Sequence, residues 1–160
     1  MTSATNPRDK IRIQSTDFDV GSELASLRAG DPTIGATATF VGLVRDLNDA
    51  RDIAAMELEH YPGMTERAIE QIVAQARTRW KLNGCTVIHR VGRLYPVDQI
   101  VLVAVASAHR QDAFAACEFI MDFLKTSAPI WKKEATAEGE YWVAARASDN
   151  VARDRWNQPD

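Results

Sequence analysis

The chain has 160 residues with an ordinary globular composition, 46% hydrophobic and 26% charged, and a formal net charge of −3. A chain of this length can bury a core without disulfides or metals. Its acidic balance excludes a surface that is basic throughout, so any cationic site must be local. No apolar run approaches the roughly 18 residues that span a bilayer, and the polar N-terminus lacks the apolar segment of a signal peptide. We therefore expect a cytoplasmic protein.

The N-terminal half is predicted to contain one long helix between short strands. Ile69, Ile72, Val73 and Ala76 recur at the helical period, and the β-branched and aromatic residues of 36–44 favour a strand. In chain order, we expect a flexible tail (1–10), a short strand (11–13), a helix (20–28), strands at 36–44 and 53–60, and a helix at 65–80.

The C-terminal half is predicted to contain a second long helix beside a buried strand. Residues 100–106 are nearly all apolar, as in a strand that is covered on both faces. Because strands and helices do not alternate strictly, we expect one α+β domain over 11–150, with a mixed or antiparallel sheet and two main helices. The expected elements are strands at 86–91 and 100–106, a helix at 111–125, short strands at 130–134 and 141–144, and a polar C-terminal tail at 151–160.

Cysteine and histidine usage gives no sign of a metal or a redox centre. The two cysteines, Cys85 and Cys117, do not form a metal-binding or disulfide pattern, and Cys117 falls on the apolar face of the second long helix. The three histidines are not spaced as a metal cluster, and the sequence signatures of nucleotide-binding loops, serine hydrolases and zinc proteases are absent. We expect no metal and no cofactor.

A cationic site is predicted between 107 and 134. His109 and Arg110 follow a buried strand and precede a helix, whose free N–H groups and positive dipole end favour an anion. The alternative is that both are solvated loop residues. At the other end of that helix, Lys125 either balances the helix dipole or, beside the apolar segment 127–131, is partly desolvated and has a lowered pKa suited to a base or nucleophile.

Two further segments are candidates for this chemistry. Lys132 and Lys133 alternate along a predicted strand, so we expect only one of them to enter a pocket. Arg45 directly follows the strand 36–44 and is either a site residue or a surface residue. The segment 59–64, with its His, Tyr, Pro and Gly, is either catalytic or a strand-to-helix turn held by a His–Glu hydrogen bond, and the structural interpretation is favoured.

The same residues carry a resemblance to a known family. Over about residues 11–150 the chain resembles the catalytic large subunits of molybdopterin synthase, the MoaE family. The matching stretches are FVGLVR (40–45), LEHYPGM (58–64), VIHRVG (87–92), SAHR (107–110), FIMDFLKT (119–126) and APIWKKE (128–134). Each motif is modest evidence alone, but their common order is specific.

The resemblance implies an α/β-hammerhead fold and a sulfurtransferase that needs no cofactor. It further implies a homodimer whose subunits each bind a small ubiquitin-like sulfur carrier, giving a heterotetramer. The carrier ends in Gly-Gly as a thiocarboxylate. The implied reaction adds two sulfurs from that tail to cyclic pyranopterin monophosphate and forms the dithiolene of molybdopterin.

Site roles are also implied by position. Lys125 and Lys132 match catalytic lysines, and Met121 lines the pocket. Leu43 stands where some relatives carry lysine. The residues that match substrate-binding positions are Arg45, His109, Arg110, Met121, Lys133, Glu134 and Arg146, of which the last reaches either its own or the neighbouring subunit's site.

Two other function classes compete with this interpretation. A non-catalytic binding module for a phosphorylated metabolite would explain His109 and Arg110 but leaves Lys125 and Lys132 without a task. An RNA-binding protein would require a basic face interleaved with aromatic residues, which the sequence does not have.

Overall fold

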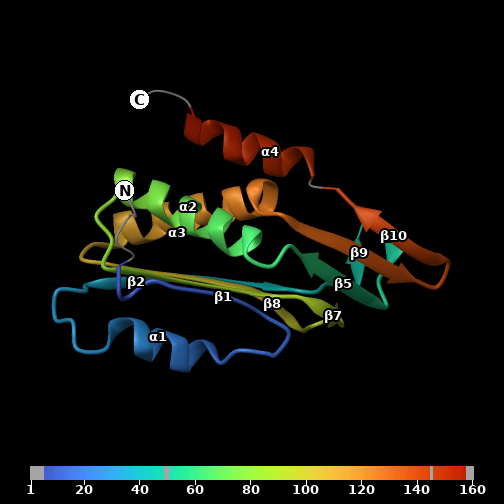
Figure 1. Ribbon diagram of the computed structural model, residues 1–160, viewed down its shortest axis with the longest axis horizontal. Coiled ribbons are helices and arrows are strands. Elements are labelled where there is room, and N and C mark those ends of the chain that lie inside the picture. The colour runs from blue at the N-terminus through green and yellow to red at the C-terminus, as the bar shows by residue number, and fades with distance from the viewer. Residues whose placement is uncertain (1–5, 49–50, 145, 158–160) are drawn as a thin grey trace.

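The computed structural model describes residues 6–48, 51–144 and 146–157. Helices and strands form two four-stranded sheets and a short two-stranded one (Figure 1). In chain order the elements are β1 (Lys10–Gln14), α1 (Val20–Arg28), β2 (Ala36–Leu43), β3 (Leu47–Asn48), β4 (Arg51–Asp52), β5 (Ala55–His60), α2 (Met64–Arg79), β6 (Gly84–Arg90), β7 (Gly92–Leu94), β8 (Gln99–Ser107), α3 (Arg110–Ser127), β9 (Ile130–Thr136), β10 (Gly139–Val143), α4 (Ala147–Asp154) and a 3₁₀ turn (Arg155–Asn157). The predicted α+β class is confirmed, and α2 and α3 are its two main helices.

The first sheet has the strand order β1-β6-β8-β2 and is mixed, because β1 runs parallel to β6 while the other pairs are antiparallel. Figure 1 shows α1 on one side of this sheet and α2 and α3 on the other. Both faces are therefore covered, and residues 101–107 of β8 are all buried. This confirms the prediction drawn from the apolar run of that strand.

Alternation along β6 divides the core between these two sides. Cys85 and Val87 pack against α2 and α3, whereas Ile88 belongs to the cluster under α1. Cys85 and Cys117 are both buried free thiols. Burial raises the pKa of Cys85 to about 12 and that of Cys117 to about 11. Neither is a nucleophilic thiolate at neutral pH, in agreement with their predicted structural role.

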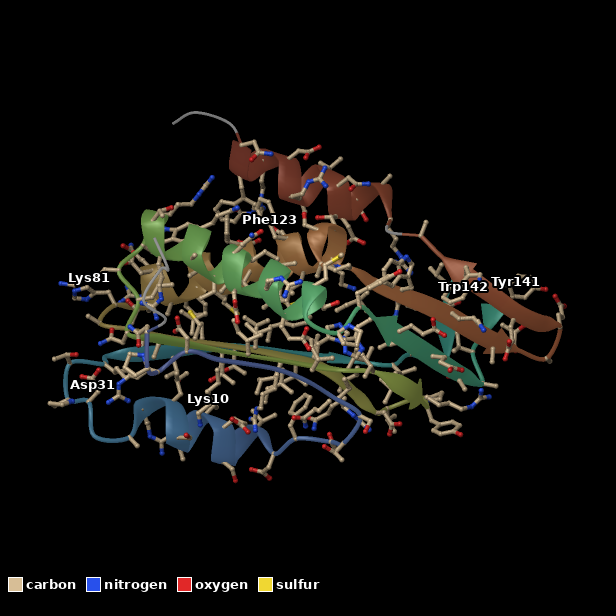
Figure 2. The ribbon with its side chains drawn as sticks, viewed as in Figure 1. Lys10, Asp31, Lys81, Phe123, Tyr141 and Trp142 are labelled. Carbon is tan, nitrogen blue, oxygen red and sulfur yellow. The ribbon has the colours of Figure 1, made fainter. Side chains whose placement is uncertain are left out.

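The second sheet is antiparallel, with the order β10-β9-β5-β7. It extends past the end of α3, and Trp142 and Tyr141 lie on its outer strand, away from the helices (Figure 2). A small buried cluster that includes Met56, Leu58 and Leu94 packs on the face of the sheet that carries Lys132 and Glu134. The sequence predicted β5, β9 and β10 but neither β7 nor the separation of these strands into a second sheet.

The C-terminal segment is not the polar tail predicted for 151–160. Residues 147–157 form α4 and the 3₁₀ turn, which lie along α3 (Figure 1). The ring of Trp156 packs edge-on against Trp80 and Phe119, at centroid distances of 5.6 and 5.5 Å, and its Nε1 donates to Asp122 at 2.7 Å. One tryptophan thus docks an otherwise polar helix, which composition alone does not reveal. Residues 158–160 lie outside the described residues.

The prediction of a flexible N-terminal tail over 1–10 is also wrong for its last two residues, Asp9 and Lys10. The Asp9 carboxylate accepts two hydrogen bonds from the Arg77 guanidinium, at 3.0 and 2.5 Å, and one from the Cys85 backbone N–H at 2.9 Å. β1 begins at Lys10, immediately afterward. Asp9 pairs with Arg77, which is distant in sequence, so local sequence patterns could not predict that Asp9 is held in place. Residues 1–5 lie outside the described residues.

Among the residues that the structure describes, none of the helices is both long enough and apolar enough to cross a membrane.

Candidate functional site

A cavity of about 590 Å³ opens where the end of β2, the C-terminal end of α3 and the inner face of the second sheet meet. Its apolar wall includes Met56, Leu58, Ile100, Val101, Met121, Leu124 and Ile130. Its polar groups are Arg45, His89, Lys125, Lys132, Glu134, Arg146, Ser148 and Asp149. The cavity therefore combines an apolar surface with four cations, which suits a ligand that has a flat organic body and an anionic group. Met121 lines it, as predicted.

Lys125 projects into this cavity from the last turn of α3. Its side chain stays accessible, but the surrounding cavity wall partly desolvates the ammonium group. Desolvation is the main cause that lowers the pKa of Lys125, and the nearby positive charges of Lys132, Arg146 and Arg45 lower it further. Asp149 acts in the opposite direction. This direction agrees with the desolvated alternative for Lys125, and such a lysine gives up its proton more readily than a solvated one.

β9 separates the two neighbouring lysines, as strand alternation predicted. Lys132 and Glu134 face the cavity, with Lys132 Nζ 3.3 Å from Glu134 Oε1, and Glu134 is only 2% exposed. Lys133 lies on the other face, where its Nζ is 3.6 Å from Glu140 Oε2 and 4.9 Å from the centre of the Trp142 ring. The structure therefore does not place Lys133 in the cavity, although its position matched a substrate-binding one.

Two arginines reach the cavity from chain segments that are distant in sequence. Arg45 follows β2, and the preceding residue, Val44, is held by backbone hydrogen bonds to Asp98 and from Val97, each of 2.9 Å. Arg146 stands at the start of α4, where its backbone N–H donates to the Asp149 carboxylate at 3.2 Å. Arg146 thus lines the cavity of its own chain.

His109 and Arg110 are not in this cavity. They are exposed at the start of α3, whereas Lys125 lies in its last turn. A helix of 18 residues is roughly 27 Å long, so its two ends cannot share one pocket within a single chain. The prediction that 107–134 forms one cationic pocket is wrong in this respect. The substrate-binding role of His109 and Arg110 stays a prediction.

The turn between β5 and α2 is held by local hydrogen bonds, and residues 59–64 are not among those that line the cavity. The backbone N–H of Gly63 donates to the Glu66 carboxylate at 2.6 Å, and the backbone N–H of Tyr61 donates to Thr65 Oγ1 at 3.1 Å. The predicted His–Glu hydrogen bond is not formed, because His60 Nε2 lies 3.9 Å from Glu66 Oε1, beyond hydrogen-bonding distance. The two backbone hydrogen bonds close the strand-to-helix turn, in place of the predicted bond to His60.

Sequence reasoning missed His89 and Asp149 as cavity residues. Asp149 was hidden in a segment whose helix the sequence did not predict. For His89 a signal existed, because Cys85, Val87 and His89 alternate along β6 and share one face. Within the described residues, no group of three or more His, Cys, Asp and Glu side chains is placed to hold a metal ion.

Comparisons with known proteins relate most of the chain to one family. Residues 13–127 match the family model described as MoaE protein. The chain is 63% identical over 146 residues to the molybdopterin synthase catalytic subunit of Ralstonia nicotianae, covering 91% of this chain and 83% of that protein. Its structure resembles the molybdopterin biosynthesis MoaE protein of Burkholderia ambifaria, with a TM-score of 0.81, 58% identity, and coverage of 94% and 99%. For molybdopterin synthase of Staphylococcus aureus these values are 0.76, 30%, 86% and 97%.

Proposed function

This chain belongs to the MoaE protein family, and we propose that it is the catalytic subunit of a molybdopterin synthase. The observation that carries this proposal is the cavity in which Lys125, Lys132, Arg45 and Arg146 surround one end of an apolar wall. Arg45 is distant in sequence from the other three cations, and all four side chains line one cavity.

We propose that the reaction is the transfer of two sulfurs to cyclic pyranopterin monophosphate, in the cytoplasm. The donor is the C-terminal thiocarboxylate of a small ubiquitin-like carrier subunit. Both reactants are anions, so they repel one another unless fixed positive charge holds them together. Arginine is suited to the cyclic phosphate because its guanidinium donates two parallel hydrogen bonds. The apolar wall is suited to the pterin ring.

The two lysines have different roles in this proposal. Lys125, whose pKa is lowered by burial, exchanges a proton with the reacting groups or assists covalently. Lys132 is paired with the buried Glu134 and keeps a fixed position, which suits the binding of an anion. The sulfur arrives on the carrier, so no enzyme thiol is needed. The burial of Cys85 and Cys117 agrees with this.

His109 and Arg110 fit the proposal if the protein forms the homodimer expected for the family. Two copies whose α3 helices run antiparallel would bring the start of one helix near Lys125 of the other. With one carrier bound to each subunit, the assembly would be a heterotetramer. Mixing Arg110→Ala with Lys125→Ala chains should restore activity that neither variant has alone, because mixed dimers contain one intact site. No recovery in demonstrably mixed dimers would exclude this arrangement.

The experiment that tests the function combines the protein, a thiocarboxylated carrier and cyclic pyranopterin monophosphate. Formation of molybdopterin is followed through its fluorescent oxidised derivative. Lys125→Ala should reduce turnover by roughly 10²- to 10⁴-fold while carrier and substrate still bind, since proton transfer contributes about that much. Lys125→Arg, which keeps the positive charge but cannot lose its proton, is the matched control and should be similarly impaired.

Two results would contradict the proposal. Absence of product with the wild-type protein and an authentic carrier would exclude the synthase activity. Tight substrate binding without turnover would instead favour a non-catalytic binding module for a phosphorylated metabolite.

A further inference from the structure

His89 occupies a distinct place at the inner end of the cavity. On β6 it follows Cys85 and Val87, which pack in the core against α2 and α3. Two residues farther along the same face, the strand leaves the core and His89 lines the cavity beside Val101, its partner across β8. His89 is therefore a largely buried imidazole in the cavity lining, next to the apolar side chain of Val101.

The hydrogen bonding of this imidazole defines its tautomer. Its Nδ1 lies 2.8 Å from the backbone carbonyl oxygen of Arg90. A carbonyl oxygen can only accept, so Nδ1 carries the proton, and Nε2 of the neutral ring has a free lone pair. Among the described residues, no buried side-chain nitrogen or oxygen lacks a hydrogen-bond partner. Because the ring bonds to the protein through Nδ1, Nε2 reaches accessible space, which at this position is the cavity.

The surroundings keep the ring neutral. Burial lowers the pKa of His89 to about 4, and the nearby charges of Lys125 and His60 lower it too, against the opposing effect of the hydrogen bond to Arg90. At neutral pH Nε2 is therefore an acceptor and not a further cation. The other polar side chains of the cavity are four cations, the Ser148 hydroxyl and two carboxylates, of which Glu134 pairs with Lys132 and Asp149 accepts from the Arg146 backbone.

We propose that His89 Nε2 accepts a hydrogen bond from a ring N–H or amino group of the pterin and thereby orients the substrate in the cavity. This inference rests on the proposed function. A pterin ring carries N–H donors, and the arginines and lysines of the cavity cannot accept hydrogen bonds. An N–H group left without an acceptor against an apolar wall is unfavourable, so one well-placed acceptor decides how the ring lies. His89 is then a specificity-determining residue.

Two substitutions separate this role from a structural one. In His89→Asn, the side-chain amide can still donate to the Arg90 carbonyl, but no atom occupies the position of Nε2. In His89→Gln, the longer side chain can place its carbonyl oxygen near that position. We expect His89→Asn to weaken substrate binding roughly tenfold and His89→Gln to bind nearly as well as wild type. A purely structural role predicts the reverse order.

The measurement is the Kd of cyclic pyranopterin monophosphate by isothermal titration calorimetry, with thermal unfolding of each variant as the control for folding. In wild type the affinity should also fall as the pH approaches 4, because protonation of Nε2 removes the acceptor. His89→Gln should lack the part of that fall due to His89, since Lys125, Lys132, His60, Glu134 and Asp149 are the same in both proteins.

The outcomes distinguish this inference from the function itself. If wild type makes molybdopterin but His89→Asn binds substrate as tightly as wild type, the inference is wrong and the function stands. If wild type neither binds the substrate nor makes the product, both are wrong.

Discussion

The two four-stranded sheets of this chain differ in what covers them. The first sheet lies between helices, and its central strand β8 is buried on both faces with apolar side chains. The second sheet has one face toward the cavity, with Lys132 and the buried Glu134, and another that exposes Trp131 and Trp142. Apolar residues of similar volume commonly stabilise a protein as well as a buried ion pair does. A role in the chemistry of the site therefore explains the Lys132–Glu134 pair on β9 better than a contribution to stability does.

The largest difference in activity should be between substitutions on the two faces of β9. We expect Lys132→Ala to lower kcat/KM for molybdopterin formation about 100-fold, or roughly 2.7 kcal/mol, because it removes a fixed positive charge from the cavity. Lys133→Ala, the matched control one residue away, should change kcat/KM less than about threefold, since that side chain contacts Glu140 and Trp142 instead. Equal losses in both variants would contradict the assignment of faces.

A change in the first sheet should affect stability instead of chemistry. Val103 is fully buried at the centre of β8. Val103→Ala leaves a small cavity and should lower the free energy of unfolding by about 2 kcal/mol, measured by denaturant titration. Turnover per folded molecule should stay unchanged. A tenfold fall in kcat without a loss of stability would show that the sheets are not divided in this way.

The smallest effect should come from the thiols. Cys85 and Cys117 are buried and burial raises their pKa values to about 12 and 11, so iodoacetamide should label neither in the folded protein at pH 7. Cys117→Ala should keep wild-type turnover and lose about 1 kcal/mol of stability. Rapid labelling seen by mass spectrometry, or loss of turnover in that variant, would give a thiol a part in the reaction.

Much of the fold follows from local patterns in the sequence. The 3.6-residue period predicted α2 and α3, and the apolar run of 100–106 predicted a strand covered on both faces. Strand alternation by itself put Lys132 and Lys133 on opposite faces of β9. These features depend on neighbours a few residues apart, so the sequence contains all the information that they need.

Contacts between distant segments decided the rest. Trp156 docks the C-terminal helix against Trp80 and Phe119, although its own segment is polar. The site itself is of the same kind, because Arg45, Lys125 and Arg146 meet at one cavity while His109 and Arg110 lie a helix length away. The sequence motifs identified these residues as candidates, but a motif contains no information about the distances between them. Which of them share a cavity depends on how rigid helices and sheets pack, and that is set by the tertiary structure.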